Sequence, residues 1–193
     1  MSHGLLVVLS APSGAGKDTL LAHLRRRRFP WPLHIAITAT TRPRRRGERE
    51  GVPYHFLSRQ EFLRRRDDGW FLEHAEVYGH LYGVPKEEVT PYLERGATVI
   101  AKIDVQGAAS VRALFPDAVL VFLAADAHEL EERMRTRGAD DRAALARRLA
   151  TAGHELAQSS WFDYLIVNPK GGLRQATDAL AAIIIAERHR IRR

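Results

Sequence analysis

The chain has 193 residues, 45% of them hydrophobic and 27% charged, a composition that can bury a core and that excludes a disordered tail. It contains no cysteine, which excludes a disulfide framework and a thiolate metal site and fits a reducing cytosol. No apolar run approaches the ~20 residues needed to cross a bilayer, and the chain starts without a basic leader, so we expect a cytoplasmic protein without membrane contact.

Short apolar runs alternate with helical patterns along the chain. Strands that alternate with helices predict an α/β fold, in which a parallel sheet is covered on both faces. Residues 35–90 break this rhythm, because they are rich in arginine, glycine, proline and aromatic residues, and they predict a β-containing insertion. The expected strands are residues 5–9, 99–103, 119–123 and 164–167, and the expected helices are 17–28, 106–114, 128–137, 142–158 and 173–189.

The first strand is followed by a glycine-rich turn that opens the first helix, which is the setting of a phosphate-binding loop. Gly14 and Gly16 let the backbone curl so that its N–H groups point at phosphate oxygens, and Lys17 adds a positive charge for the β- and γ-phosphates of ATP. This loop predicts the three-layer fold of a P-loop NTPase. The expected ATP-binding residues here are Ala11, Pro12, Ser13, Gly14, Ala15, Gly16, Lys17, Asp18 and Thr19.

The loop departs from the strict phosphate-loop pattern at two positions. Ala11 stands in place of the first glycine, and Asp18 stands in place of the usual serine or threonine. A carboxylate at position 18 could ligate Mg²⁺ directly, yet it would also repel the phosphates, and Thr19 could supply the missing hydroxyl. An ordinary glycine-rich turn between strand and helix is the alternative interpretation.

Four further segments carry a specific resemblance. Residues 38–56 read TATTRPRRRGEREGVPYHF, and they are followed by FLEHAEVYGHLYG, IDVQGA and DYLIVN, which start at residues 71, 103 and 163. These segments resemble the guanylate kinase family, in whose order they occur, and the first meets every fixed position of that family's GMP-binding signature. The resemblance spans nearly the whole chain. It implies one domain with a GMP-binding insertion at 35–90, a lid region at 126–158 and a core of residues 1–34, 91–125 and 159–193.

The chemistry of GMP gives roles to the residues of these segments. GMP carries a dianionic phosphate, which Arg42 and Arg45 could bind in bidentate fashion. Guanine presents an N1–H and an exocyclic amine on one edge, and a single carboxylate can accept both, so we expect Glu73 to read the base. The alternative for Arg42 and Arg45 is a role at the protein surface, and the alternative for Tyr54 and Tyr82 is packing under a loop. The resemblance adds two phosphate contacts and one base contact, namely Tyr54, Tyr82 and Thr38.

Val84 is a departure from the family, whose members usually carry at this position a threonine or serine that hydrogen-bonds guanine. Losing one hydroxyl contact costs roughly 1 kcal/mol. Guanine selectivity should therefore be weaker than usual, although Glu73 is retained.

Asp104 follows an expected strand, which should place its carboxylate at the carboxyl edge of the sheet. The resemblance implies that it holds Mg²⁺ through water and takes part in GMP binding, and a helix cap is an alternative that does not exclude this role. Arg137 and Arg148 would close from the lid over the transferring phosphoryl group, with Arg137 also contacting ATP and Arg133 a further candidate. Asn168 would contact adenine. The expected catalytic residues are Lys17, Arg42, Asp104, Arg137 and Arg148.

The resemblance implies an enzyme of purine nucleotide metabolism that transfers the γ-phosphate of ATP to GMP or dGMP with Mg²⁺ as cofactor. Two alternatives stay open. A ribose 1,5-bisphosphate phosphokinase is favoured by Asp18 but not by Glu73, because a sugar phosphate has no base to read. A non-catalytic guanylate-kinase-like interaction module is disfavoured by Lys17, which such modules tend to lose.

The formal net charge of +7 comes mainly from arginine, which would also suit a nucleic-acid binder. Arginine clusters occur at 25–28, 44–46 and 64–66. Solvated helix ends and the positive cleft of an enzyme with two phosphorylated substrates explain them, so we expect no nucleic-acid partner. A homo-oligomer is compatible with the sequence.

Overall fold

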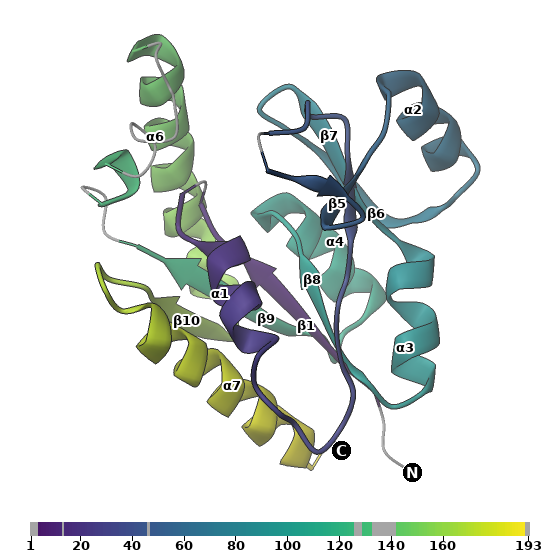
Figure 1. Cartoon of the computed structure of the whole chain (residues 1–193), viewed down its shortest axis with the longest axis vertical. Coiled ribbons are helices and arrows are strands. Elements are labelled where there is room, and N and C mark those ends of the chain that lie inside the picture. Colours follow the sequence, from purple (N-terminus) through teal and green to yellow (C-terminus); the bar gives the residue numbers. More distant parts are fainter. Residues whose placement is uncertain (1–3, 13, 46, 126–128, 133–141, 192–193) are drawn as a thin grey trace. The chain divides into compact units, whose positions relative to one another are not determined.

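The structure is a computed structural model that describes residues 4–12, 14–45, 47–125, 129–132 and 142–191 (Figure 1). Five strands form one sheet in the order β10-β9-β1-β8-β2. The pairs β2–β8 and β9–β10 are parallel, which confirms the expected α/β fold. The strands are β1 (Leu5–Ser10), β2 (Leu33–Ile35), β8 (Thr98–Lys102), β9 (Val119–Ala124) and β10 (Tyr164–Val167).

By their internal contacts, the residues fall into two compact units. The first comprises Met1–Val8 and Phe29–Val119, and the second comprises Leu9–Arg28 and Leu120–Arg193. The division into a core, an insertion and a lid remains a prediction. Within the described residues, no helix is both long and apolar enough to span a membrane.

The first unit contains a second five-stranded sheet, in the order β4-β5-β3-β7-β6. Phe62, from helix α2, and Phe71, from β6, stack at 4.3 Å between ring centres and form the centre of a small core. Ser58 caps α2 by accepting a hydrogen bond from the Glu61 amide. The elements of this part are β3 (Thr38–Thr40), β4 (Arg49–Glu50), β5 (Pro53–Phe56), α2 (Arg59–Asp67), β6 (Phe71–Val77) and β7 (His80–Pro85).

Three helical segments complete the first unit: the 3₁₀ turn η1 (Lys86–Glu88), α3 (Thr90–Glu94) and α4 (Val105–Leu114). Helix α4 follows directly on β8 and packs against β6. The end of β8 is therefore brought to the strand that carries Glu73.

The second unit contains α1 (Lys17–Leu24), α6 (Arg142–Ala157), the 3₁₀ turn η2 (Gln158–Trp161) and α7 (Leu173–His189). Helices α1 and α7 lie side by side (Figure 1). The expected strand at 164–167 and helix at 173–189 are confirmed. The expected helix at 128–137 falls mostly outside the described residues.

The expectation that the first helix runs to Arg28 was wrong, because α1 ends at Leu24. The amides of Arg26 and Arg27 donate to carbonyls three residues back, which marks tight turns instead of a continued α-helix.

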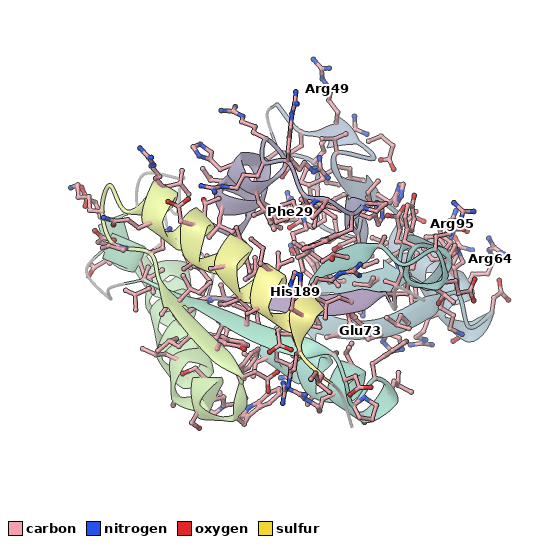
Figure 2. The ribbon with its side chains drawn as sticks, turned by 90° about the horizontal axis from the view of Figure 1, so that it is seen from below. Phe29, Arg49, Arg64, Glu73, Arg95 and His189 are labelled. Atoms are coloured by element: carbon pink, nitrogen blue, oxygen red, sulfur yellow. The ribbon has the colours of Figure 1, made fainter. Side chains whose placement is uncertain are left out.

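The arginines of α2 lie at the surface among acidic side chains. Arg64 pairs with Glu61 at 2.9 Å and with Asp68 at 3.0 Å, and Arg65 pairs with Glu61 at 2.6 Å. Figure 2 shows Arg64 extending away from the ribbon, as Arg49 and Arg95 also do. Such exposed pairs add little to stability because water screens their charges, so this cluster is best understood as a solvated helix face.

Candidate functional site

Pairing in the second sheet brings together four of the residues expected to bind the acceptor. In the register of β3 with β5, Thr38 lies opposite Tyr54, and in the register of β3 with β7, Thr40 lies opposite Tyr82. The Tyr54 and Tyr82 rings meet edge to face at 6.3 Å between centres. Arg42 follows β3 by two residues, and its amide donates to the Thr40 hydroxyl at 3.1 Å. Strand pairing therefore gathers side chains that are far apart in the sequence.

The Arg42 side chain is largely buried and held by two acceptors. Its guanidinium donates to the Glu48 carboxylate at 2.8 Å and to the Pro43 carbonyl at 2.7 Å. Glu48 also accepts from the Arg45 amide at 2.7 Å, and although burial opposes it, these hydrogen bonds lower the pKa of Glu48. Glu48, to which sequence reasoning gave no role, thus orients Arg42. Glu48 occupies a fixed position of the GMP-binding signature, and this was the sequence signal that could have identified its role.

Glu73 is a buried carboxyl group on β6, labelled in Figure 2. Its Oε2 atom has no hydrogen-bond partner in the described part of the chain, and the same holds for the buried Oγ1 atom of Thr38. Burial, reinforced by the negative charge of Asp104, raises the pKa of Glu73 to about 8. Buried polar atoms are normally paired, and other unpaired ones occur in the described residues, among them Thr98 Oγ1 in the same unit. Glu73 and Thr38 differ from Thr98 in that both stand at positions expected to contact the base.

Val84 lies directly opposite Glu73 in the pairing of β6 with β7 and is fully buried. Residues opposite each other in an antiparallel pair have Cβ atoms about 5 Å apart. The residue that departs from the family pattern is therefore a neighbour of the carboxyl group expected to read the base.

Asp104 caps helix α4, as its Oδ1 atom accepts from the Gly107 amide at 2.8 Å. This is the cap that the sequence offered as the alternative, and it leaves the second carboxylate oxygen to the site. A Cβ atom on Gly107 would come within 2.2 Å of Glu73 Oε2 and 2.5 Å of Ile103 Cγ2. Gly107, which sequence reasoning passed over, therefore provides the room in which the Glu73 carboxyl group lies.

The donor set at Asp104 fits a magnesium ion bound together with nucleotide phosphates. Mg²⁺ in such sites is held by one or two carboxylates and by phosphate oxygens, and keeps several waters. Asp104 offers one carboxylate at the carboxyl end of β8. The metal role of Asp104 remains a prediction.

The phosphate loop of the second unit is built mainly from backbone. Gly14 and Gly16 have φ angles of 90° and 97°, and Gly16 is the cap residue of α1. These positive φ values favour glycine and let successive N–H groups turn inward. Lys17, the first residue of α1, donates from Nζ to the carbonyl of Ala11. The lysine is thereby folded over the loop.

Asn168 is buried after β10, and its Nδ2 atom donates to the carbonyl of Ala15 at 2.9 Å. Asn168 therefore fastens the phosphate loop, and its expected contact to adenine remains a prediction. Asp18 and Thr19 are exposed in the first turn of α1. A carboxylate there interacts favourably with the helix dipole, which accounts for Asp18 without a metal. Its role toward Mg²⁺ stays a prediction.

Several expected residues are not placed by the structure. Ser13, Arg133 and Arg137 lie outside the described residues, and Arg148 belongs to α6, where its side chain is not described. The Arg45 side chain is exposed beside the Arg42–Glu48 pair. The contributions of the lid arginines and of Arg45 therefore remain predictions.

Comparisons with known proteins all indicate the same family. The family model described as Guanylate kinase matches residues 3–187. A guanylate kinase of Carboxydothermus hydrogenoformans is 43% identical over 189 residues, covering 97% of this chain and 91% of the relative. One of Synechococcus sp. is 44% identical over 184 residues, covering 95% of this chain and 83% of the relative.

A solved structure supports the same relationship. The crystal structure of guanylate kinase from Anaplasma phagocytophilum has a TM-score of 0.79 and 31% sequence identity, and it covers 98% of this chain and 88% of that one. This likeness agrees with the P-loop fold expected from residues 11–19.

Proposed function

We propose, because the chain belongs to the guanylate kinase family, that it transfers the γ-phosphate of ATP to GMP or dGMP and forms ADP and GDP or dGDP. The observation that carries this proposal is the pair of buried, unpartnered oxygens on Glu73 and Thr38. A carboxylate and a hydroxyl in these positions suit the N1–H and amine edge of guanine. A sugar phosphate acceptor would leave both unsatisfied, at a cost of about 1–3 kcal/mol each.

The phosphate of GMP is bound in this proposal by the cluster around Tyr54. Arg42 supplies a planar guanidinium already aligned by Glu48, and Arg45 lies beside it. The hydroxyls of Tyr54 and Tyr82 donate further hydrogen bonds. A dianionic phosphate matches this set, since charge-assisted hydrogen bonds are the strongest available to it.

ATP is bound in this proposal by the phosphate loop. Backbone N–H groups between Gly14 and Lys17 receive the β- and γ-phosphates, and the Lys17 ammonium exchanges the Ala11 carbonyl for a phosphate oxygen. Asn168 keeps the loop in shape through Ala15.

In the transfer, an oxygen of the GMP phosphate attacks the γ-phosphorus as the bond from that phosphorus to the β–γ bridging oxygen breaks. ADP leaves with the bridging oxygen and GDP carries the new phosphate, so atoms and charge balance. When bound, Mg²⁺ neutralises charge on the phosphates, and we propose Asp104 through water, and Asp18, as its protein partners. Lys17, Arg42 and the lid residues Arg137 and Arg148 stabilise charge that spreads over the oxygens.

The test is an ADP-release assay with GMP, dGMP, AMP, UMP and ribose 1,5-bisphosphate as acceptors. GMP and dGMP should be the best acceptors, and we expect the reaction to serve purine nucleotide metabolism in the cytoplasm. A preference for ribose 1,5-bisphosphate would overturn the proposal and give Asp18 a different meaning. ATP binding without turnover of any acceptor would favour the non-catalytic interaction module.

A further inference from the structure

Lys102 is a buried lysine at the end of β8, two residues before Asp104. It is 7% exposed, and among the other lysines and arginines whose burial the structure describes, Arg42 comes closest, with a side chain that is 10% exposed. A lysine is almost never buried unless its charge is matched to a nearby group. Its surroundings therefore indicate what it is for.

The residues expected to bind GMP in the first unit, namely Thr38, Arg42, Tyr54, Glu73 and Tyr82, are called the acceptor cluster below. The Lys102 ammonium group lies over an aromatic ring of this cluster. Its Nζ atom is 3.9 Å from the centre of the Tyr54 ring. The guanidinium carbon of Arg42 is 5.5 Å from the same centre, and the Tyr82 ring meets Tyr54 edge to face. Tyr54 thus lies within reach of two cations, one at the end of β8 and one two residues after β3.

The contact with Lys102 fixes the orientation of the Tyr54 ring and, with it, the direction of the phenol hydroxyl. A cation over a tyrosine face is held more strongly when it is desolvated than when it is exposed, and Lys102 is buried. Arg42 brings its charge together with that of Glu48, to which it is bonded at 2.8 Å.

We propose that Lys102 is a phosphate-positioning residue of the acceptor site: held against the Tyr54 ring, it orients the phenol that binds the acceptor's phosphate. This inference rests on the proposed function. It concerns the phosphate of the acceptor and not its base, because the ring that Lys102 contacts belongs to the cluster of Arg42 and Tyr82.

The test compares Lys102→Met with Lys86→Met. Methionine keeps the length of the buried stem and removes the charge, and Lys86 is an exposed lysine of the same unit that serves as the matched control. We expect Lys102→Met to raise the KM for GMP about tenfold, with the KM for ATP unchanged. Lys86→Met should leave both unchanged.

A second readout separates phosphate positioning from a merely structural role. Guanosine, which has the base but no phosphate, is used as a competitor of GMP. Its inhibition constant should be the same for wild type and Lys102→Met, whereas an equal loss for guanosine and GMP would overturn the proposal. An unchanged KM for GMP would overturn it as well.

Two further variants complete the design. If Lys102→Met does not fold, Lys102→Gln provides a neutral side chain that tolerates burial better, with the same expected pattern. In a Tyr54→Phe background, the Lys102→Met change should have a smaller effect than in wild type, since Lys102 acts partly through the Tyr54 hydroxyl. Full additivity would contradict this. Failure of the proposed function would appear in the wild type itself, which would not use GMP, and so differs from failure of the inference about Lys102.

Discussion

The acceptor cluster of the first unit and the phosphate loop of the second are built in different ways. In the acceptor cluster, the groups expected to touch the ligand are side chains from separate strands, and Glu73 and Thr38 carry buried, unpartnered oxygens. In the phosphate loop, the binding groups are mainly backbone amides arranged around Gly14 and Gly16. Phosphate groups can be held by backbone amides alone, whereas the acceptor cluster is expected to hold both the base and the phosphate of GMP with particular side chains.

This difference predicts two kinds of variant. A change in the phosphate loop should reduce turnover with every acceptor, since all of them need the same donor. A change in the acceptor cluster should alter the response to GMP and leave ATP binding intact. The predictions below test this separation, beginning with the largest expected effect.

Lys17→Ala should reduce kcat by about a hundredfold or more, the usual effect of removing one electrostatic contact to a transition state. The side chain is partly exposed and fills no core, so the melting temperature should stay close to that of wild type. Turnover is measured by ADP release with GMP and dGMP. Lys170→Ala is the control, because Lys170 is exposed and pairs only loosely with Glu132, at 3.3 Å. Near-normal turnover of Lys17→Ala would show that the loop does not bind the donor.

Glu73→Gln should lower kcat/KM for GMP by an amount that corresponds to roughly 2–4 kcal/mol of lost transition-state stabilisation. The amide can accept from one guanine donor only and turns its own NH₂ toward the other. The KM for ATP should not change. Glu76→Gln, on the same strand but exposed and paired with Arg59 at 3.4 Å, is the matched control. If both variants kept wild-type values for GMP, the base would be read elsewhere.

The KM for GMP should fall as the pH rises from 7 to 9, by about tenfold. Burial and Asp104 raise the pKa of Glu73 to about 8, so the carboxyl group of the free protein is mostly neutral at pH 7. Only the ionised form accepts both guanine donors, and the apparent affinity scales with its fraction. Glu73→Gln should show no such pH dependence, and a flat profile in wild type would contradict the assignment.

The same pKa shift predicts an effect on stability. An unfolded glutamate has a pKa near 4.3. Since the pKa of Glu73 is higher in the folded protein, its stabilising effect is complete below about pH 4.3 and is lost as the pH rises through about 8. Glu73→Gln cannot ionise, so its melting temperature should exceed that of wild type, and by more at pH 9 than at pH 5.

Much of the fold could be predicted from the sequence, and the expected site residues remain predictions. The strand at 164–167 and the helix at 173–189 were placed correctly, because their apolar residues follow a clear period. β2 was not predicted, since its three residues after Pro32 are too few to show the alternation of a strand. The second sheet was recognised as β-rich, but its strand order depends on pairing between distant segments, which no local pattern reveals.

The state of individual side chains was beyond the sequence. Glutamates are rarely buried, so the motif named Glu73 without indicating its unpartnered oxygen or its high pKa. Asn168 was expected at adenine, and its bond to Ala15 could not be predicted because it joins residues 153 positions apart. Gly107 was part of a motif, yet only the three-dimensional structure shows that the glutamate occupies the space beside it.

Gly107→Ala should raise the KM for GMP several-fold, up to about tenfold, and leave the KM for ATP unchanged. The added Cβ would lie 2.2 Å from Glu73 Oε2, so the carboxyl group must move from the position in which it would meet the base. The helix itself should gain up to ~1 kcal/mol from alanine. Gly153→Ala, in α6 with nothing within 4 Å of the added Cβ, is the control for that gain. An unchanged KM for GMP in Gly107→Ala would mean that the carboxyl position does not matter.

Val84→Thr should have the smallest effect, a lowering of the KM for GMP by a few-fold, which corresponds to about 1 kcal/mol. Threonine has nearly the shape of valine, and its hydroxyl would stand across the strand pair from Glu73. In the free protein this hydroxyl can donate to the unpartnered Oε2 atom, which would favour the ionised carboxylate and lower the pKa of Glu73. The pH at which the KM for GMP falls should therefore shift downward in the variant. A KM profile measured from pH 7 to 9 separates the two contributions: a uniform lowering indicates a hydroxyl contact with the base, and a shifted midpoint indicates a contact with Glu73. A higher KM across the whole range would show that the hydroxyl competes with guanine for the carboxylate.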